Sequence, residues 1–223
     1  MKTKIIVVLS VMLVLGIATT YYFKKADAEP LAENLNLVKK EPVLSYNVGD
    51  AVADFKVRST DGKTISLANY ASAKGFIIVF TSNHCPFSKA YEDRIIALDK
   101  KYDSQGFPVI AISPNDPEAY EEDSFANMQA KVKEKSYTFP YCADDNQAVS
   151  KAFGAARTPH VFVLKKEGGK NIVEYMGAID DNAQDAAGVT KRYVEDAVNN
   201  LLAGKPVVTN STKAVGCAIK WKS

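Results

Sequence analysis

The sequence is poor in the residue types that mark several specialised protein classes. It has three cysteines, two histidines and one tryptophan among 223 residues, and it has no Cys-x-x-Cys pair. Three cysteines do not make a disulfide scaffold, because an odd number leaves at least one thiol unpaired within a monomer. With 47% hydrophobic residues, 24% charged residues and no internal repeat, the chain is not disordered, collagen-like or a multi-span membrane protein.

The chain also lacks a large excess of charge of either sign. Lysine and arginine number 28, against 26 acidic residues. Residues 1–28 hold four lysines and one aspartate, so residues 29–223 carry one net negative charge. A body this close to neutral has no electrostatic footprint for nucleic acid, and we expect no nucleic-acid partner.

The longest uncharged segment lies near the N-terminus. The 19 residues from Ile5 to Phe23 carry no charge, and as a helix they would span about 28 Å, close to the hydrocarbon thickness of a bilayer. Lysines flank this segment, and Ala26-Asp27-Ala28 resembles a small-x-small cleavage site. No cysteine follows closely, which argues against a lipid-modified anchor. We therefore expect a signal peptide or N-terminal membrane anchor at 1–28, a linker at 29–45, and export to the periplasm or cell envelope.

From about residue 46 the hydrophobic pattern alternates between strands and helices. Gly75–Phe80 and Val109–Ile112 are continuous apolar runs, typical of strands buried on both faces. Alternation of this kind, followed by a hairpin and a helix, predicts an α/β sandwich of mixed sheet at 46–204, with a C-terminal tail at 205–223. The other expected elements are a hairpin around Asp61-Gly62, strands at His160–Leu164 and Asn171–Met176, and helices at Lys89–Tyr102, 117–135, Gln147–Phe153 and Thr190 to Gly204.

Acidic residues gather at three places outside the strands. In the helix expected at 117–135, Pro117 and the acidic residues up to Asp123 suit the first turns. Asp144-Asp145 and the run Ile179–Asn182 are expected to be solvated turns.

Cys85 stands where the buried strand Gly75–Phe80 runs into the next helix, and Pro86 follows at the first helical position. The unpaired backbone N–H groups and the partial positive charge of a helix N-terminus stabilise an anion. A thiol with a pKa of about 8.5 is only about 3% thiolate at pH 7, whereas a pKa of about 7 makes half of it thiolate. We therefore predict that Cys85 is a nucleophile and the most acidic of the three thiols. His84, if protonated, would act in the same direction.

Several motifs resemble the thioredoxin-like superfamily, and within it the redoxin group of alkyl-hydroperoxide-reductase and thiol-specific-antioxidant proteins. The resemblance covers about residues 46–204 and implies a three-layer sandwich with a central mixed β-sheet and helices on both faces. Thr158-Pro159 is similar to the Thr-Pro of thioredoxins, whose proline is cis and faces the reactive cysteine. The motifs that carry this resemblance are Phe55, Asp61–Lys63, Leu67, Val79–Phe80 and Gly154–Pro159. More narrowly, the chain resembles a subgroup of peroxiredoxin-like proteins without a firmly assigned reaction, through Asn83–Phe87, Ile179–Asn182 and Gly216–Trp221.

The chain departs from these family patterns at defined positions. Thioredoxins carry Cys-x-x-Cys, and Ser88 stands at the second position, so a mixed disulfide formed at Cys85 cannot be resolved within the motif. The peroxiredoxin pattern Pro-x-x-x-Thr-x-x-Cys has Ser82 in place of the threonine and Ile78 in place of the proline. Arg157 lies near the place of the distant arginine but out of register.

The resulting candidate catalytic residues are Cys85, Ser82, Pro159 and Cys217. Cys85 is the nucleophile, Pro159 shapes substrate access, and Ser82 takes the place of the peroxiredoxin threonine. Cys217, on the tail, either belongs to a packed terminus or reaches Cys85 as a resolving thiol. We expect Cys142 to pack near a strand end.

Three function classes remain open on the sequence alone. The first is a cell-envelope thiol–disulfide oxidoreductase, and the second is a thiol peroxidase of antioxidant type in which Cys85 is oxidised to a sulfenic acid. The third is a non-enzymatic binding module, in which His84, Cys85 and His160 would form a soft-metal site of a copper carrier. We favour a redoxin-type oxidoreductase without cofactor or bound metal, because thiols outside the cytoplasm are usually oxidised or under redox control. Its expected partners are protein thiols and disulfides or small peroxides, together with an external reductant.

Overall fold

The computed structural model describes residues 45–223. The segment expected to be a leader, 1–28, and the linker up to residue 44 lie outside the described residues. Residues 45–223 lie in one compact unit, so the tail at 205–223 belongs to the same unit as the domain before it. Within residues 45–223, no helix has the length and apolar character that a membrane span requires.

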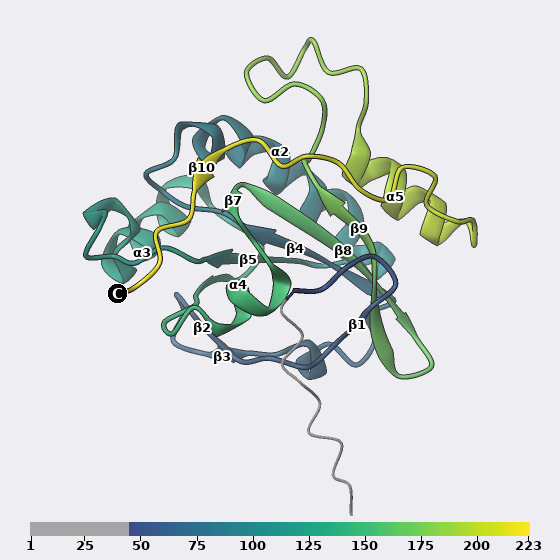
Figure 1. Ribbon diagram of the computed structural model, residues 1–223, viewed down its shortest axis with the longest axis horizontal. Coiled ribbons are helices and arrows are strands. Elements are labelled where there is room, and N and C mark those ends of the chain that lie inside the picture. The colour runs from purple at the N-terminus through teal and green to yellow at the C-terminus, as the bar shows by residue number, and fades with distance from the viewer. Residues whose placement is uncertain (1–44) are drawn as a thin grey trace, which may run out of the picture. The chain divides into compact units, whose positions relative to one another are not determined.

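An eight-stranded mixed sheet forms the centre of the unit, in the order β1-β9-β8-β4-β5-β6-β2-β3 (Figure 1). At its middle, β4 pairs in parallel with β5 and antiparallel with β8. A second, two-stranded sheet joins β7 to β10. The strands are β1 (Ala51–Val52), β2 (Val57–Ser59), β3 (Thr64–Ile65), β4 (Gly75–Phe80), β5 (Val109–Ser113), β6 (Tyr141–Ala143), β7 (Arg157–Thr158), β8 (His160–Glu167), β9 (Lys170–Gly177) and β10 (Cys217–Ala218).

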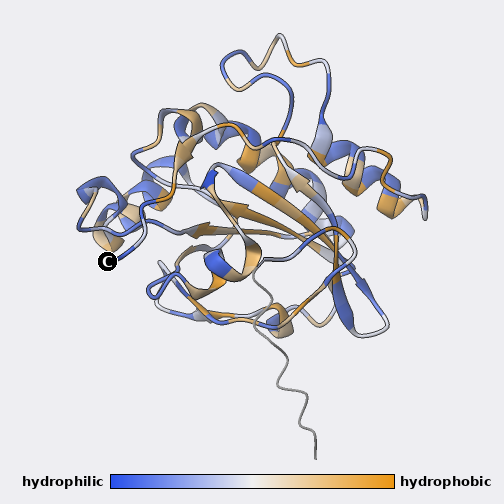
Figure 2. Cartoon of the chain, viewed as in Figure 1, coloured by the Kyte–Doolittle hydropathy of each residue, from blue (hydrophilic) through white to orange (hydrophobic). Residues whose placement is uncertain are grey.

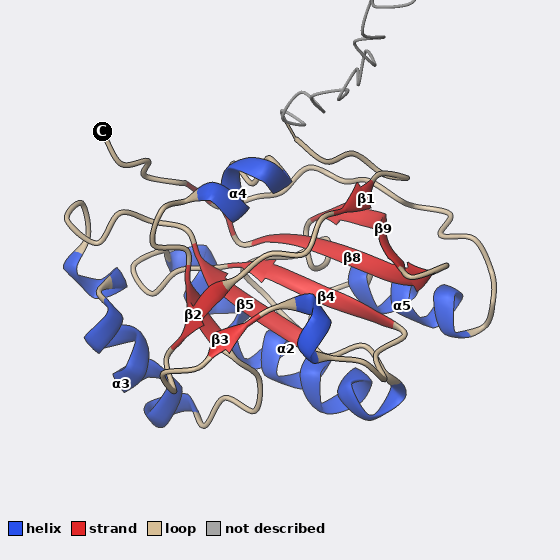
Figure 3. Cartoon of the chain, turned by 90° about the horizontal axis from the view of Figure 1, so that it is seen from below, coloured by secondary structure: helices blue, strands red, loops and turns tan. Residues whose placement is uncertain are grey.

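Helices cover both faces of the large sheet, with α4 on one face and α2 and α5 on the other (Figure 3). Along β4, Ile77 and Val79 pack into the core beneath α2 and α5, and Phe76, Ile78 and Phe80 pack into the core on the α4 side. All six residues of β4 are buried, and Figure 2 shows the central strands as hydrophobic. The three-layer α/β sandwich expected from the sequence is confirmed. The helices are α2 (Pro86–Tyr102), α3 (Phe125–Lys135), α4 (Ala148–Phe153) and α5 (Tyr193–Leu202), with 3-10 turns at η1 (Leu67–Asn69), η2 (Asp103–Gln105) and η3 (Glu121–Asp123).

The helix expected at 117–135 is shorter than the sequence pattern suggests. Helix α3 begins at Phe125, because the Ser124 side chain accepts a hydrogen bond from the Asn127 N–H and caps the helix there. The residues before it form turns and η3 instead of helical turns. Asp123 is therefore not a residue of the first helical turn, and its side chain points inward and is fully buried.

Two further expectations about polar residues are corrected. Helix α5 begins at Tyr193 rather than at Thr190, because Thr190 is bonded to Asp181 through its backbone N–H and its hydroxyl. The acidic turns are not uniformly solvated. Asp180 is buried and pairs with Arg94 at 2.6 Å, and Asp144 is buried and accepts two hydrogen bonds from Ser150.

Candidate active site

Cys85 occupies the corner between β4 and α2, as the sequence predicts. It is the N-cap residue of α2, with an extended backbone, and Pro86 takes the first helical position. Its side chain is fully buried, with an exposed fraction of 0%. The Cys85 thiol donates a hydrogen bond to the Thr158 carbonyl oxygen, with a sulfur–oxygen distance of 3.0 Å. The corner thus aims the thiol at the end of β7.

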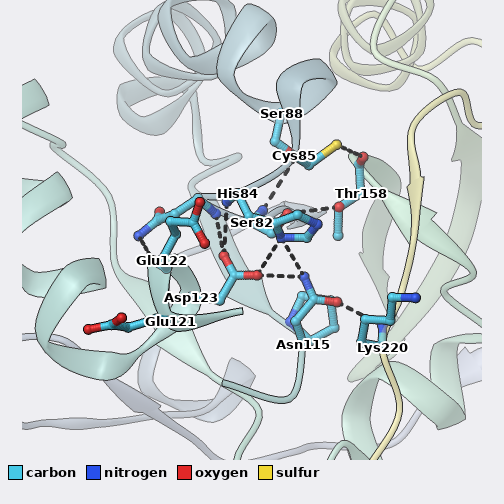
Figure 4. Close-up of polar contacts among 12 residues, drawn as sticks. Ser82, His84, Cys85, Ser88, Asn115, Glu121, Glu122, Asp123, Thr158 and Lys220 are labelled. Atoms are coloured by element: carbon cyan, nitrogen blue, oxygen red, sulfur yellow. Dashed lines mark hydrogen bonds and ion pairs between the residues drawn. The ribbon is translucent and has the colours of Figure 1, made fainter. Parts of the chain in front are cut away.

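Thr158, Ser82 and Ser88 surround this thiol (Figure 4). The peptide bond from Thr158 to Pro159 is cis, in keeping with the resemblance to thioredoxins, and Pro159 is buried. The hydroxyls of Ser82 and Thr158 are 2.9 Å apart, and the Ser82 N–H donates to the Ser88 hydroxyl at 3.4 Å. Ser82 therefore links the first turn of α2 to β7, the two segments that meet at Cys85.

Cys217 reaches the same place from the far end of the chain. Strand β10 pairs antiparallel with β7, and this pairing sets Cys217 directly opposite Thr158. The backbones approach so closely that a Cβ atom added to Gly216 would lie 2.0 Å from the Thr158 carbonyl oxygen. The sequence left open whether the tail reaches Cys85, and the described fold brings Cys217 to Thr158, the residue whose carbonyl accepts the hydrogen bond of the Cys85 thiol.

The surroundings of the three cysteines give their thiols different acidities. Burial raises the pKa of Cys85, but hydrogen bonds from the Cys217 thiol, from backbone N–H groups of Ser88 and Cys217, and from Thr158 outweigh it. The pKa of Cys85 therefore lies below its ordinary value. Burial raises the pKa of Cys217 to about 11, and the hydrogen bond it gives to Cys85 acts in the same direction. Burial also raises the pKa of Cys142, which lies within β6, to about 12. Cys85 is thus the one thiol of the three whose pKa is lowered, and the Cys217 thiol lowers it more than the Ser88 N–H in the first turn of α2 does.

The tail that carries Cys217 is held on both sides of the site, and we call residues 211–222 the strap. On one side, the Thr212 hydroxyl lies 2.6 Å from the Tyr175 hydroxyl and accepts a hydrogen bond from the Ala178 N–H. On the other side, the Ile219 side chain is buried, and the Lys220 N–H donates to the side-chain oxygen of Asn115 at 2.9 Å. Between these anchors the strap contributes β10 to the second sheet, as the yellow ribbon in Figure 1 shows.

His84 does not interact with Cys85 in the way the sequence suggested. Its ring Nδ1 lies 2.6 Å from a carboxylate oxygen of Asp123 (Figure 4). The ring stacks on Tyr120, with centroids 3.8 Å apart. Asp123 also accepts hydrogen bonds from the N–H groups of Asn83 and His84 and from the Asn115 side chain. His84 is not among the groups that lower the pKa of Cys85. The result is a buried carboxylate that orients the ring of the residue before Cys85.

Sequence reasoning missed Asp123 and Asn115. The sequence pattern assigns Asp123 to the start of a helix. Asp123 lies 39 residues from the His84 that it binds, so no helical or strand spacing indicates that the two side chains meet. Asn115 does carry a usable signal. It follows the end of β5, which is parallel to β4, and polar residues at the carboxyl ends of adjacent parallel strands tend to meet in one site.

The proposed grouping of His84, Cys85 and His160 as a metal site is wrong. His84 is turned to Asp123, while His160 packs against Phe162, whose side chain belongs to the core on the α4 side. Burial lowers the pKa of His160 to about 4. Within residues 45–223, no three His, Cys, Asp or Glu side chains are placed to hold a metal ion together.

Arg157 does not take the place of a peroxiredoxin arginine. Its side chain donates to the Gly216 carbonyl oxygen at 2.8 Å, and the residue is exposed. Its positive charge lowers the pKa of Cys217. Arg157 is not one of the groups with the largest effects on the pKa of Cys85. Arg157 therefore holds the strap.

Comparisons with known proteins agree with the fold described above. Residues 48–175 match the model of the AhpC/TSA family. Crystal structures of a hypothetical protein from Sinorhizobium meliloti 1021 and of an uncharacterized conserved protein from Geobacillus kaustophilus are 33% and 34% identical to the chain, with TM-scores of 0.74 and 0.73. These matches cover 80% of the chain and 97% of the first structure, and 79% of the chain and 93% of the second.

A curated relative carries a named activity. The thiol-disulfide oxidoreductase ResA of Halalkalibacterium halodurans is 24% identical over 120 residues, which are 54% of this chain. The chain spans 64% of the length of that relative.

Proposed function

Because the chain belongs to the AhpC/TSA family, we propose that it is a thiol–disulfide oxidoreductase in which Cys85 attacks a substrate disulfide and Cys217 completes the exchange. The observation that carries this proposal is the pairing of β10 with β7. Thr158 accepts the hydrogen bond of the Cys85 thiol and at the same time faces Cys217 across the two-stranded sheet. Cys217 thereby takes the role that the second cysteine plays in a Cys-x-x-Cys motif, where this chain has Ser88.

The exchange proceeds in two steps. The Cys85 thiolate attacks one sulfur of the substrate disulfide, and the other substrate sulfur leaves as a thiolate that takes up a proton. The Cys217 thiol then loses its proton and attacks the Cys85 sulfur, which breaks the mixed disulfide and releases the second substrate thiolate. The substrate gains two electrons, and Cys85 and Cys217 become a disulfide. An external dithiol reductant returns them to the reduced form.

Peroxide is the second class of oxidant for the same two thiols. It would oxidise Cys85 to a sulfenic acid, which Cys217 would convert to the same disulfide with loss of water. The surroundings of Cys85 favour a disulfide substrate, since Ser82 is bonded to Thr158 and Arg157 is bonded to the strap. Neither side chain is arranged to bind a peroxide at the Cys85 sulfur.

The test compares reduction of a protein disulfide by wild type, Cys217→Ser and Cys142→Ser, with a dithiol as reductant. We expect Cys217→Ser to accumulate a mixed disulfide and to turn over at least about tenfold more slowly, because an intramolecular thiol acts at high effective concentration. Cys142→Ser is the matched control and should keep the wild-type rate. Unchanged turnover in Cys217→Ser would contradict the proposed role of Cys217. If the wild type consumes hydrogen peroxide faster than it reduces the protein disulfide, the substrate is a peroxide rather than a disulfide.

We also propose that this reaction takes place outside the cytoplasm. The support is the uncharged segment from Ile5 to Phe23 with its flanking lysines. Cell fractionation combined with the mass of the mature chain tests this. A chain beginning near Glu29 indicates a cleaved signal peptide, and a full-length chain in the membrane fraction indicates an anchor. A full-length chain found only in the cytoplasm would contradict export.

A further inference from the structure

The thiol that the proposed exchange uses is closed off in the described fold. Cys85 and Thr158, whose carbonyl accepts its hydrogen bond, both have an exposed fraction of 0%. In disulfide exchange the attacking sulfur must reach one sulfur of the substrate disulfide, so the rate depends on access. A protein disulfide has no such access to Cys85 in this state. Part of the cover over the thiol must therefore move before the first step.

The strap is the segment that lies over the sulfur. Strand β10 pairs with β7, and the Cys217 thiol and backbone N–H both donate hydrogen bonds to the Cys85 sulfur. Figure 4 shows the strap, in pale yellow, passing Thr158 on its way to Lys220. Within residues 45–223, neither of the two clusters of buried apolar side chains includes Cys85. The strap, rather than a core side chain, therefore covers the thiol.

We propose that the strap is a gate for Cys85: β10 leaves β7 to admit the substrate disulfide, and it returns to place Cys217 for the second step. The inference rests on the proposed function, since it concerns access to the same two thiols. Opening breaks no covalent bond and changes no oxidation state. Cys85 attacks while the strap is open, and Cys217 attacks the mixed disulfide once the strap closes.

The closed strap leaves no room for a substrate between β10 and β7. Even a Cβ atom added to Gly216 would lie 2.0 Å from the Thr158 carbonyl oxygen and 3.1 Å from the Pro159 nitrogen. A substrate segment is larger than a methyl group, so it does not enter while the two strands are paired. Substrate binding at Thr158 and the pairing of β10 with β7 therefore exclude each other.

The strap can open while the rest of the domain stays folded. Ile219 is the only buried residue of the strap, and β10 is two residues long. Within residues 45–223, β10 pairs with β7 alone, in a sheet separate from the eight-stranded one. Segments with few buried apolar contacts open locally at a lower free energy than the core. Opening of the strap therefore leaves the large sheet and α2 intact.

The other elements around the thiol belong to the core. Ser82 follows β4, Ser88 lies in α2, and Pro159 leads into β8. Strands β4 and β8 are neighbours in the middle of the large sheet, and α2 packs its buried side chains against that sheet. Moving any of them disrupts core packing, which costs far more than a local opening. Of the segments that surround Cys85, the strap is the one suited to move.

Two anchors hold the gate closed. The Ile219 side chain packs into the core on the α4 side, and its N–H donates to the Ala156 carbonyl oxygen at 3.2 Å. The Thr212 hydroxyl lies 2.6 Å from the Tyr175 hydroxyl at the other end of the strap. Weakening either anchor raises the open fraction without changing a reacting group. The first step should then become faster, and the second slower, because Cys217 is less often in place.

The experiment follows the two steps separately with an aromatic disulfide, 5,5′-dithiobis(2-nitrobenzoate), in a stopped-flow spectrometer. The first equivalent of coloured thiolate reports attack by Cys85, and the second reports attack by Cys217 on the mixed disulfide. We expect Ile219→Ala to speed the first phase by at least about tenfold. Thr212→Val, which removes one hydroxyl, should speed it by about threefold. Both variants should slow the second phase.

The controls make the same changes at exposed positions of the tail outside the strap. Val208→Ala and Thr209→Val should change neither phase. Repeating the first phase in a Cys217→Ser background removes the other thiol that could attack the reagent, so the signal reports Cys85. A variant that only damaged the site would slow both phases, so opposite changes in the two phases are the signature of a gate.

Hydrogen exchange at the backbone N–H of residue 219 reports strap opening in the same variants. Faster exchange with an unchanged first phase would refute the gate and leave the exchange chemistry standing. Unchanged exchange in both variants would show that these anchors do not hold the strap closed, and this too would refute it. A wild type whose Cys85 releases no coloured thiolate would instead refute the proposed function itself.

Discussion

Replacing Cys217 by alanine or by serine separates two effects of this side chain on Cys85. Among the groups that lower the pKa of Cys85, the hydrogen bond from the Cys217 thiol acts most strongly. A serine hydroxyl keeps a donor at this position, and alanine removes it. A hydrogen bond to a charged group contributes about 1.5–3 kcal/mol, and about 1.4 kcal/mol corresponds to a factor of ten in an equilibrium. Below the midpoint of the Cys85 titration, the thiolate fraction should therefore fall by about tenfold or more in Cys217→Ala and by much less in Cys217→Ser.

The assay is the thiolate absorbance near 240 nm recorded against pH, with the rate of alkylation of Cys85 as a second measurement. Cys142 does not interfere below pH 10, because burial raises its pKa to about 12. Both variants should lose the ability to resolve a mixed disulfide, so only the acidity of Cys85 distinguishes them. If Cys217→Ala titrates like wild type, the Cys217 thiol does not stabilise the Cys85 thiolate. The reasoning from the β10–β7 pairing would then be refuted.

Three further predictions concern the strap and the core. Ile219→Ala should loosen the strap, since truncating a buried isoleucine costs about 2–5 kcal/mol, and it should speed alkylation of the buried Cys85 at pH 9. Val208→Ala, at a tail position that is 87% exposed, is the control, and equal rates in both variants would contradict this anchoring. Gly216→Ala should slow disulfide formation, because its Cβ would lie 2.0 Å from a carbonyl oxygen of β7; an unchanged rate would show that the close pairing is not needed. Finally, His160 binds a proton at an ordinary pKa of about 6.5 when unfolded but at about 4 when folded. Its neutral form therefore stabilises the fold above pH 6.5, and this stability is lost as the pH falls toward 4. Urea unfolding should show a loss of about 2 kcal/mol between pH 7 and pH 5 that is absent in His160→Leu, and equal losses in the two proteins would argue against a buried neutral His160.

The amino-acid sequence by itself determined the elements whose hydrophobic pattern is local. The apolar run Gly75–Phe80 matches β4 residue for residue, and the position of Pro86 gave the start of α2 and hence the placement of Cys85. Both follow from interactions between residues a few positions apart, namely burial on two faces and the missing N–H of proline. The resemblance to redoxins rests on the same local motifs.

Local rules failed where a tertiary contact competed with them. The acidic residues before Phe125 suit a helix start, but Asp123 is satisfied instead by N–H groups of Asn83 and His84. Burying a carboxylate with four donors is more favourable than leaving it at a helix terminus, where the gain from the dipole is about 0.3–1 kcal/mol. The expected helix at 117–135 therefore begins at Phe125.

Only the tertiary structure decided which residues join Cys85. Thr158 lies 73 residues from Cys85 along the chain, and Asp123 lies 39 residues from His84, so no periodicity or spacing connects either pair. Cys217 is brought to the site by the pairing of two short strands and by anchors at Thr212 and Ile219. The place of Cys85 at a strand-to-helix corner could thus be predicted from the sequence, whereas the positions of Cys217 and of Asp123 beside His84 depend on how distant segments pack.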